Sequence, residues 1–119
     1  MTHTGHMPIQ MHAAAEFAFG VLLVAAAFAL GLGATAIGIA ILAGILLVTL
    51  ALGATEPGGR GSIPVSAHAT YDWAIGFGMV AAGIVFAFAG NLGAFGLFAV
   101  GGAIELLLAS RTRYSAAAR

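Results

Sequence analysis

The residues that could do chemistry in this chain recur in one spaced pattern. His12 lies four residues before Glu16, and His68 lies four residues before Asp72. Residues four apart share one face of a helix, so each histidine can contact its own carboxylate. Two imidazoles and their carboxylates could bind a divalent metal of the zinc, manganese or iron type, or relay protons. On this spacing alone, His12 and His68 are candidate metal ligands.

Composition indicates the elements that must position these residues. Of the 119 residues, 61% are hydrophobic and 7% are charged, and four arginines balance four acids. A water-soluble domain carries about 25% charged residues, so this chain cannot cover a globule with a polar surface. Zero net charge without a basic cluster excludes nucleic acid as a partner, and the absence of cysteine excludes disulfides and thiolate chemistry. The composition predicts a multi-pass protein of a lipid bilayer.

Two long uncharged runs define the membrane spans. One contains 39 residues and begins after Glu16, and the other contains 32 residues and begins after Asp72. A single span needs about 20 residues, so each run must fold back on itself. Glycine and asparagine at 31–35 and 90–93 favour tight turns there. The sequence therefore predicts four helices, at about 12–31, 34–54, 70–89 and 92–110.

The segments between and around the spans divide the chain. We expect a polar tail at 1–11, a first transmembrane hairpin at 12–54, an exposed loop at 55–67, a second transmembrane hairpin at 68–110 and a basic tail at 111–119. An even number of spans places the tails and the loop on one side, and that side holds Arg60, Arg111, Arg113 and Arg119. Positive charge marks the cytoplasmic side. The pattern predicts a multi-pass protein of the cell (inner) membrane with cytoplasmic N- and C-termini.

An internal repeat relates the two hairpins. A shift of 56 residues aligns Pro8, His12, Glu16 and Gly20 with Pro64, His68, Asp72 and Gly76. The match is specific because the chain has only three prolines, four histidines and four acids. Copies with an even number of spans enter the membrane from the same side, as a parallel repeat. The predicted fold is all-α: an integral membrane four-helix bundle made of two tandem two-helix hairpin repeats.

Small residues along the spans predict close helix packing. The candidate packing positions are Gly20, Gly76 and Gly83. Glycine lets helix backbones approach where no hydrophobic effect drives association. These faces could serve packing within one four-helix unit or contacts between copies.

Two segments in the second half of the chain carry a resemblance to a known family. The segment 64–72 (Pro-Val-Ser-Ala-His-Ala-Thr-Tyr-Asp), the following Gly76 and the segment 101–108 (Gly-Gly-Ala-Ile-Glu-Leu-Leu-Leu) resemble the SPW-repeat family of small bacterial integral membrane proteins. The resemblance covers most of the chain and implies paired two-helix repeats, without an activity. The Ser-Pro-Trp that names the family is replaced by Ala-Ala-Phe at 26–28 and by Ala-Gly-Ile at 82–84.

In this topology the polar residues of the spans meet near one membrane face. The candidate polar cluster consists of His12, Glu16, His68, Asp72 and Glu105. Ionisable groups inside spans are costly, which favours a dedicated site. The alternative is structural: each histidine pairs with the acid one turn on, and the helix dipole stabilises acids in the first turns. Glu105, near a helix C-terminus, should find a donor in a histidine or Arg111, or else be protonated.

The sequence contains no nucleophile triad, phosphate-binding loop or dinucleotide fingerprint, so we expect no enzyme and no cofactor. The leading hypothesis is a non-catalytic structural or accessory protein that packs against itself, as a homo-oligomer, or against other membrane protein subunits. One alternative is a small proton-coupled transporter, resembling small multidrug-resistance exporters in its single early carboxylate, Glu16. The other is a membrane module that binds a ligand or metal through its histidines and carboxylates.

Overall fold

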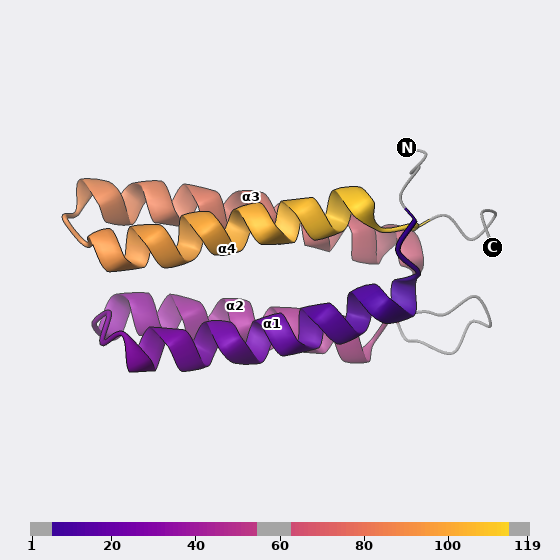
Figure 1. The fold of residues 1–119 in the computed structure, drawn as a ribbon, viewed down its shortest axis with the longest axis horizontal. Helices are drawn as coiled ribbons and strands as arrows, with labels where there is room; N and C mark the ends of the chain where they lie inside the picture. Colours follow the sequence, from indigo (N-terminus) through magenta and orange to yellow (C-terminus); the bar gives the residue numbers. More distant parts are fainter. Residues whose placement is uncertain (1–5, 55–62, 115–119) are drawn as a thin grey trace.

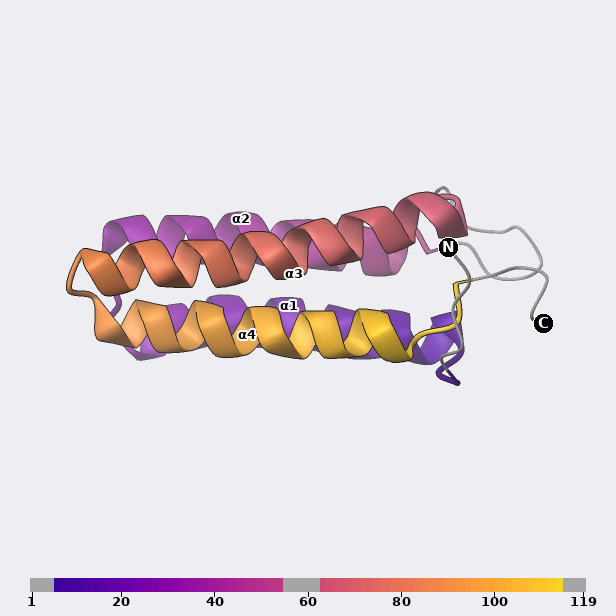
Figure 2. The ribbon, with the colours of Figure 1, turned by 90° about the horizontal axis from the view of Figure 1, so that it is seen from above.

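The computed structural model describes residues 6–54 and 63–114, which form four helices. They are α1 (Ile9–Ala29), α2 (Ala34–Leu52), α3 (Val65–Phe88) and α4 (Leu92–Arg111), shown in Figure 1. Each helix is long and apolar enough to cross a membrane. In the perpendicular view of Figure 2 the helices still run side by side. The predictions of an all-α chain with four spans and of a small multi-pass membrane protein agree with this structure.

Proline sets the start of α1 and α3. Pro8 and Pro64 precede the first helical residue with extended backbone, and their carbonyl oxygens accept N–H groups four residues on, at 3.0 and 2.9 Å. Proline suits a helix start because it has no N–H that would need a partner. The helices therefore begin at Ile9 and Val65, earlier than the expected boundaries at about 12 and 70.

The expected tails and loop fall partly outside the described residues. The segments outside are 1–5, 55–62 and 115–119, with Arg60 and Arg119 among them. The described residues that flank these segments lie at one end of the molecule. Short backbone pairings there join Met7 to Thr112 and Ala54 to Ile63. At this end α1 and α3 begin and α2 and α4 finish, so α1 and α3 run parallel (Figure 1).

Glycines form the turns at the opposite end. Gly31, Gly33 and Gly90 have φ angles of 61°, 93° and 81°. Side chains with a Cβ rarely adopt this region, so glycine is the residue that suits it. The connections between the helices, at 30–33 and 89–91, overlap the turns that the sequence predicts at 31–35 and 90–93.

Replacing Asn91, which connects these two turns, with alanine should lower the free energy of unfolding by about 1–2 kcal/mol. Its Oδ1 accepts the N–H of Ala94 at 3.0 Å and caps α4, while its Nδ2 donates to the carbonyl oxygen of Leu32 at 2.9 Å. Serine is shorter and can keep only the cap, so Asn91→Ser should lose less. Thermal unfolding in mild detergent compares the variants, and equal losses would show that the bond to Leu32 contributes nothing.

Glycine permits the closest approaches between helices. A Cβ on Gly20 would lie 2.9 Å from the carbonyl oxygen of Gly44 on α2. A Cβ on Gly76 would lie 2.6 Å from a side-chain atom of α4, and one on Gly83 would lie 2.9 Å from the backbone nitrogen of Ala99 on α4. A larger side chain at these positions would push the helices apart. The three glycines therefore lie in contacts inside each hairpin.

The burial pattern suits helices surrounded by lipid. Large apolar side chains point outward, with Leu22 64% and Phe88 90% exposed. Inside, Phe86 stacks on Phe98 with ring centroids 5.5 Å apart. Among the residues that the structure describes, the fully buried polar side chains are those of His12, Glu16, His68, Asp72, Glu105 and Thr112. Contact between an ionisable group and lipid is energetically costly, so such groups face the protein interior and apolar groups face the lipid.

Candidate functional site

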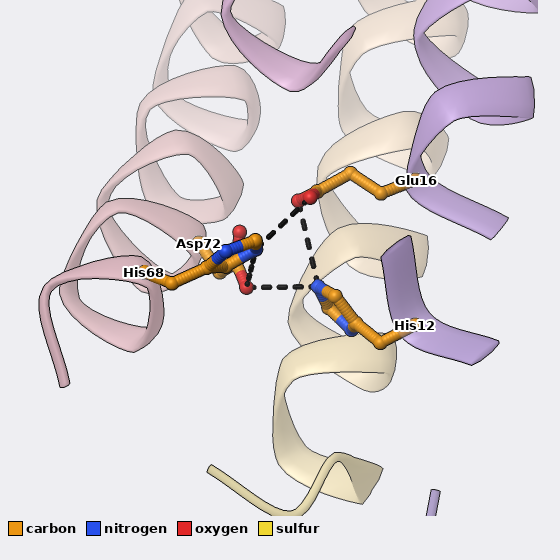
Figure 3. A group of neighbouring side chains, drawn as sticks. All are labelled: His12, Glu16, His68 and Asp72. Carbon is orange, nitrogen blue, oxygen red and sulfur yellow. Dashed lines mark hydrogen bonds and ion pairs between the residues drawn. The ribbon is translucent and has the colours of Figure 1, made fainter. Parts of the chain in front are cut away.

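Four buried side chains from α1 and α3 converge where both helices begin, and we term them the His/acid centre. Figure 3 shows His12 and Glu16 facing His68 and Asp72. Nε2 of His12 lies 2.8 Å from Oδ2 of Asp72, and Nε2 of His68 lies 3.0 Å from Oε1 of Glu16. The distances within each helix are longer, at 3.5 Å in α1 and 3.3 Å in α3. Each histidine therefore lies closest to the acid of the other helix.

Glu16 and Asp72 lie too deep in their helices for the structural role considered above, in which the helix dipole stabilises acids of the first turns. Glu16 and Asp72 are the eighth residues of their helices, and the first turns of α1 and α3 contain no acid. This depth is about 10 Å from the helix start, whereas the helix dipole acts on groups within the first turn. Stabilisation by the dipole is thus a wrong prediction, because the prolines start the helices early. The closest pairs run between helices, so the centre joins the first hairpin to the second.

Thr112 sets the orientation of the His12 ring. Its hydroxyl oxygen lies 2.6 Å from the carbonyl oxygen of Leu108 and 2.7 Å from Nδ1 of His12. A carbonyl oxygen can only accept, so the hydroxyl donates to Leu108 and accepts the N–H of His12 Nδ1. In a neutral ring this leaves the lone pair on Nε2, which faces the two carboxylates.

Tyr114 packs against the centre from the segment that follows α4. It is 4% exposed, and its hydroxyl donates to Oδ2 of Asp72 at 2.5 Å. Its ring centroid lies 5.6 Å from that of His12. Burial raises the pKa of the Tyr114 hydroxyl above its usual value, and the negative charge of Asp72 adds to the effect. The phenol therefore remains a proton donor to the carboxylate.

Backbone pairing holds this segment in place. The N–H of Met7 donates to the carbonyl oxygen of Arg111 at 3.0 Å, and the N–H of Arg113 donates to the carbonyl oxygen of Met7 at 2.9 Å. These two hydrogen bonds hold the segment that follows α4 against Met7, beside the start of α1. Residues that the sequence assigns to two polar tails form part of the site.

Sequence reasoning missed Thr112 and Tyr114. Both fall within the segment expected as a basic tail, and a hydrogen bond from Thr112 to a residue 100 positions away has no local signature. One signal was available for Thr112. Glu105 and Ala109 are buried residues of α4 that lie four positions apart, and Thr112 lies three positions after Ala109, which continues the spacing of one helix face. The buried face of α4 continues one step past the helix end.

Glu105 lies near the centre without a donor. Neither of its carboxyl oxygens has a hydrogen-bond partner among the described residues. The expected donors are directed elsewhere, because both histidines face Glu16 and Asp72, and Arg111 is exposed at the end of α4. The first alternative predicted for Glu105, a histidine or arginine donor, is therefore wrong for the described residues, which leaves the second alternative, a protonated carboxyl group. Its carboxyl group interacts electrostatically with Glu16 and Asp72, so three of the four acids share one region, as expected.

The chemistry of the centre follows from the atoms that face one another. Nε2 of His12 and Oδ2 of Asp72 both carry lone pairs, and atoms of this kind at 2.8 Å need a cation between them, either a proton or a metal ion. Among the described residues, Nε2 of His12 and Oε2 of Glu16 have no partner in hydrogen-bond geometry. The centre can therefore share protons, as a lock between the hairpins, or bind a small cation.

Comparisons of the chain with protein-family models, with curated proteins and with solved structures found no match. The resemblance to the SPW-repeat family and the tandem-repeat interpretation therefore stay predictions made from the residues.

Proposed function

We propose that this chain is a non-catalytic membrane protein of the structural or accessory type, which pairs with a second copy of itself in the bilayer. An apolar groove between α2 and α3 carries the proposal. The His/acid centre acts as the internal lock that fixes one hairpin against the other and so shapes the groove. In this proposal the termini face the cytoplasm, on the side of the arginines, and the hairpins are SPW-like repeats.

The groove lies along the seam where α2 meets α3. It has a volume of about 670 Å³, and its lining is almost entirely apolar. Its wall on α3 is low, because Ala74, Gly78 and Ala82 follow one another at intervals of four residues. Its wall on α2 is bulky, and Leu42 and Leu46 are 60% and 44% exposed there. A low wall beside a bulky one leaves room for side chains from another helix.

A second copy suits this surface because the groove carries both halves of a helix-packing contact. In a two-fold pair each partner presents the same patch, so the patch must be complementary to itself. Here the leucine ridge of α2 in each copy would pack on the small-residue wall of α3 in the other. Close packing on small residues is a main source of helix association in lipid.

Replacing Gly78 with leucine should dissociate the pair. A Cβ at Gly78 would have no other atom within 4 Å, so the single chain can accept the side chain while the groove is filled. We expect the dimer to weaken at least tenfold, which corresponds to about 1.4 kcal/mol. Native mass spectrometry and energy transfer between labelled copies, both in mild detergent, measure the change.

Gly38→Leu is the matched control. Gly38 is also an exposed helical glycine with no atom within 4 Å of its Cβ, and it lies outside the groove lining. Dimers of equal strength in both variants, or a wild-type chain that stays monomeric in detergent and in lipid, would refute pairing through the groove. A different membrane subunit that is captured by wild type and lost only in Gly78→Leu would replace the second copy as the occupant.

A further inference from the structure

We propose that the His/acid centre binds a divalent transition-metal cation, with zinc-type coordination by His12, Glu16, His68 and Asp72. This site goes beyond the proposed pairing of copies and does not depend on it. Ligand geometry, charge and unpartnered buried atoms carry the proposal.

The ligand atoms already lie close to coordination distances. Each of the four residues offers one ligand atom, and these atoms all lie within 4.8 Å of one another. The four distances between histidine nitrogens and carboxylate oxygens are 2.8, 3.0, 3.3 and 3.5 Å. These distances involve both carboxyl oxygens of Glu16, Oε2 toward His12 and Oε1 toward His68. Ligands about 2.0–2.2 Å from a tetrahedral metal lie about 3.3–3.6 Å apart, so the closest pair must open by about half an ångström and any pair near the 4.8 Å bound must close.

Charge selects a divalent cation. Two neutral imidazoles and two carboxylates carry two negative charges, which a divalent ion cancels. A buried group with uncancelled charge is costly, so neither a monovalent nor a trivalent ion suits the centre as well. Imidazole nitrogen favours zinc, iron or manganese over magnesium and calcium, which prefer oxygen ligands alone.

Two further observations indicate a ligand. Thr112 holds the His12 proton on Nδ1 and leaves the Nε2 lone pair directed at the centre, as partners of metal-bound histidines do. In addition, Nε2 of His12 and Oε2 of Glu16, which lie 3.5 Å apart, are buried with no hydrogen-bond partner among the described residues. Buried polar atoms in native structures almost always have partners. A cation would supply the missing interactions of these atoms.

Cobalt(II) is the probe that tests the site. The full chain, purified through a tag without histidine and stripped with a chelator, should bind one Co²⁺ and show the visible absorption of a tetrahedral ion. One equivalent of Zn²⁺ should displace the cobalt, whereas Mg²⁺ should not. Thr112→Val should weaken Co²⁺ binding about 10–100-fold, because the bond that orients His12 is lost. Circular dichroism should show the same helix content in this variant as in wild type.

Cysteine substitution makes the ligand assignment specific, because the chain has no cysteine of its own. Asp72→Cys and Glu16→Cys should each add a thiolate-to-cobalt charge-transfer band, since thiolate is a strong ligand for such ions. Ser110→Cys is the control: Ser110 is exposed on α4, and its variant should add no such band. Two ligand variants are used so that, if one does not fold, the other decides.

Two results would overturn the proposal. The first is a folded wild-type chain that takes up no stoichiometric Co²⁺ or Zn²⁺ at micromolar concentrations. The second is a folded ligand variant whose cobalt spectrum matches that of Ser110→Cys. Neither result affects the pairing of copies, which is measured separately through Gly78.

Discussion

Replacing Asp72 with alanine should lower the free energy of unfolding by about 3–5 kcal/mol, as expected when one partner of a buried ionic group is removed. Asp72 is where the contacts of the centre meet. Its Oδ2 accepts the hydroxyl of Tyr114 at 2.5 Å and lies 2.8 and 3.3 Å from Nε2 of His12 and of His68. Alanine would leave these three buried groups without that oxygen, and Glu16 alone would face two imidazoles.

Unfolding in mild detergent, followed by circular dichroism, measures this loss. A chelator in the buffer removes any stabilisation by bound metal. Thr70→Ala is the control on the same helix: Thr70 is exposed, its hydroxyl donates only to the carbonyl oxygen of Ser66 at 3.2 Å, and the change should stay within about 0.5 kcal/mol. If Asp72→Ala costs no more than this control, the centre is not the junction between the hairpins.

Much of the fold could be predicted because a bilayer imposes simple demands. Apolar runs of fixed length become helices, and the chain between them must turn where glycine allows, as at Gly31 and Gly90. The helix starts were harder to place. The first apolar residues mark where lipid begins, whereas Pro8 and Pro64 mark where helical hydrogen bonds begin, and α1 and α3 follow the prolines. The helices extend past the apolar runs into the polar end.

The sequence could predict which residues form the candidate site, but it could not predict which histidine lies closest to which carboxylate. The 56-residue match singles out His12, Glu16, His68 and Asp72, and a spacing of four suggests pairs within each helix. The closer pairs cross between α1 and α3, and they depend on the separation and rotation of the two helices. These quantities follow from packing along the whole length of the helices. The contact from Thr112 depends, in addition, on how the chain after α4 pairs with the chain before α1.

Replacing Gly102 with leucine should lower the free energy of unfolding by about 3 kcal/mol, at the upper end of overpacking effects. A Cβ at Gly102 would lie 2.8 Å from the carbonyl oxygen of Gly76 and 2.8 Å from the backbone nitrogen of Val80. Backbone atoms cannot turn aside as a flexible side chain can, so α3 and α4 must separate. Gly96→Leu is the control on the same helix, because a Cβ at Gly96 would have no other atom within 4 Å. Equal stability of the two variants would show that close contact at Gly102 is not required.

The same pair of variants connects helix packing to the site. Gly102 lies one turn before Glu105, and α4 ends beside Thr112, whose hydroxyl oxygen is 2.7 Å from Nδ1 of His12. Moving α4 away from α3 therefore withdraws the group that orients a histidine of the centre. Gly102→Leu should weaken Co²⁺ binding together with stability, whereas Gly96→Leu should change neither. A Gly102→Leu chain that loses stability but keeps its cobalt affinity would show that α1 and α3 alone hold the centre.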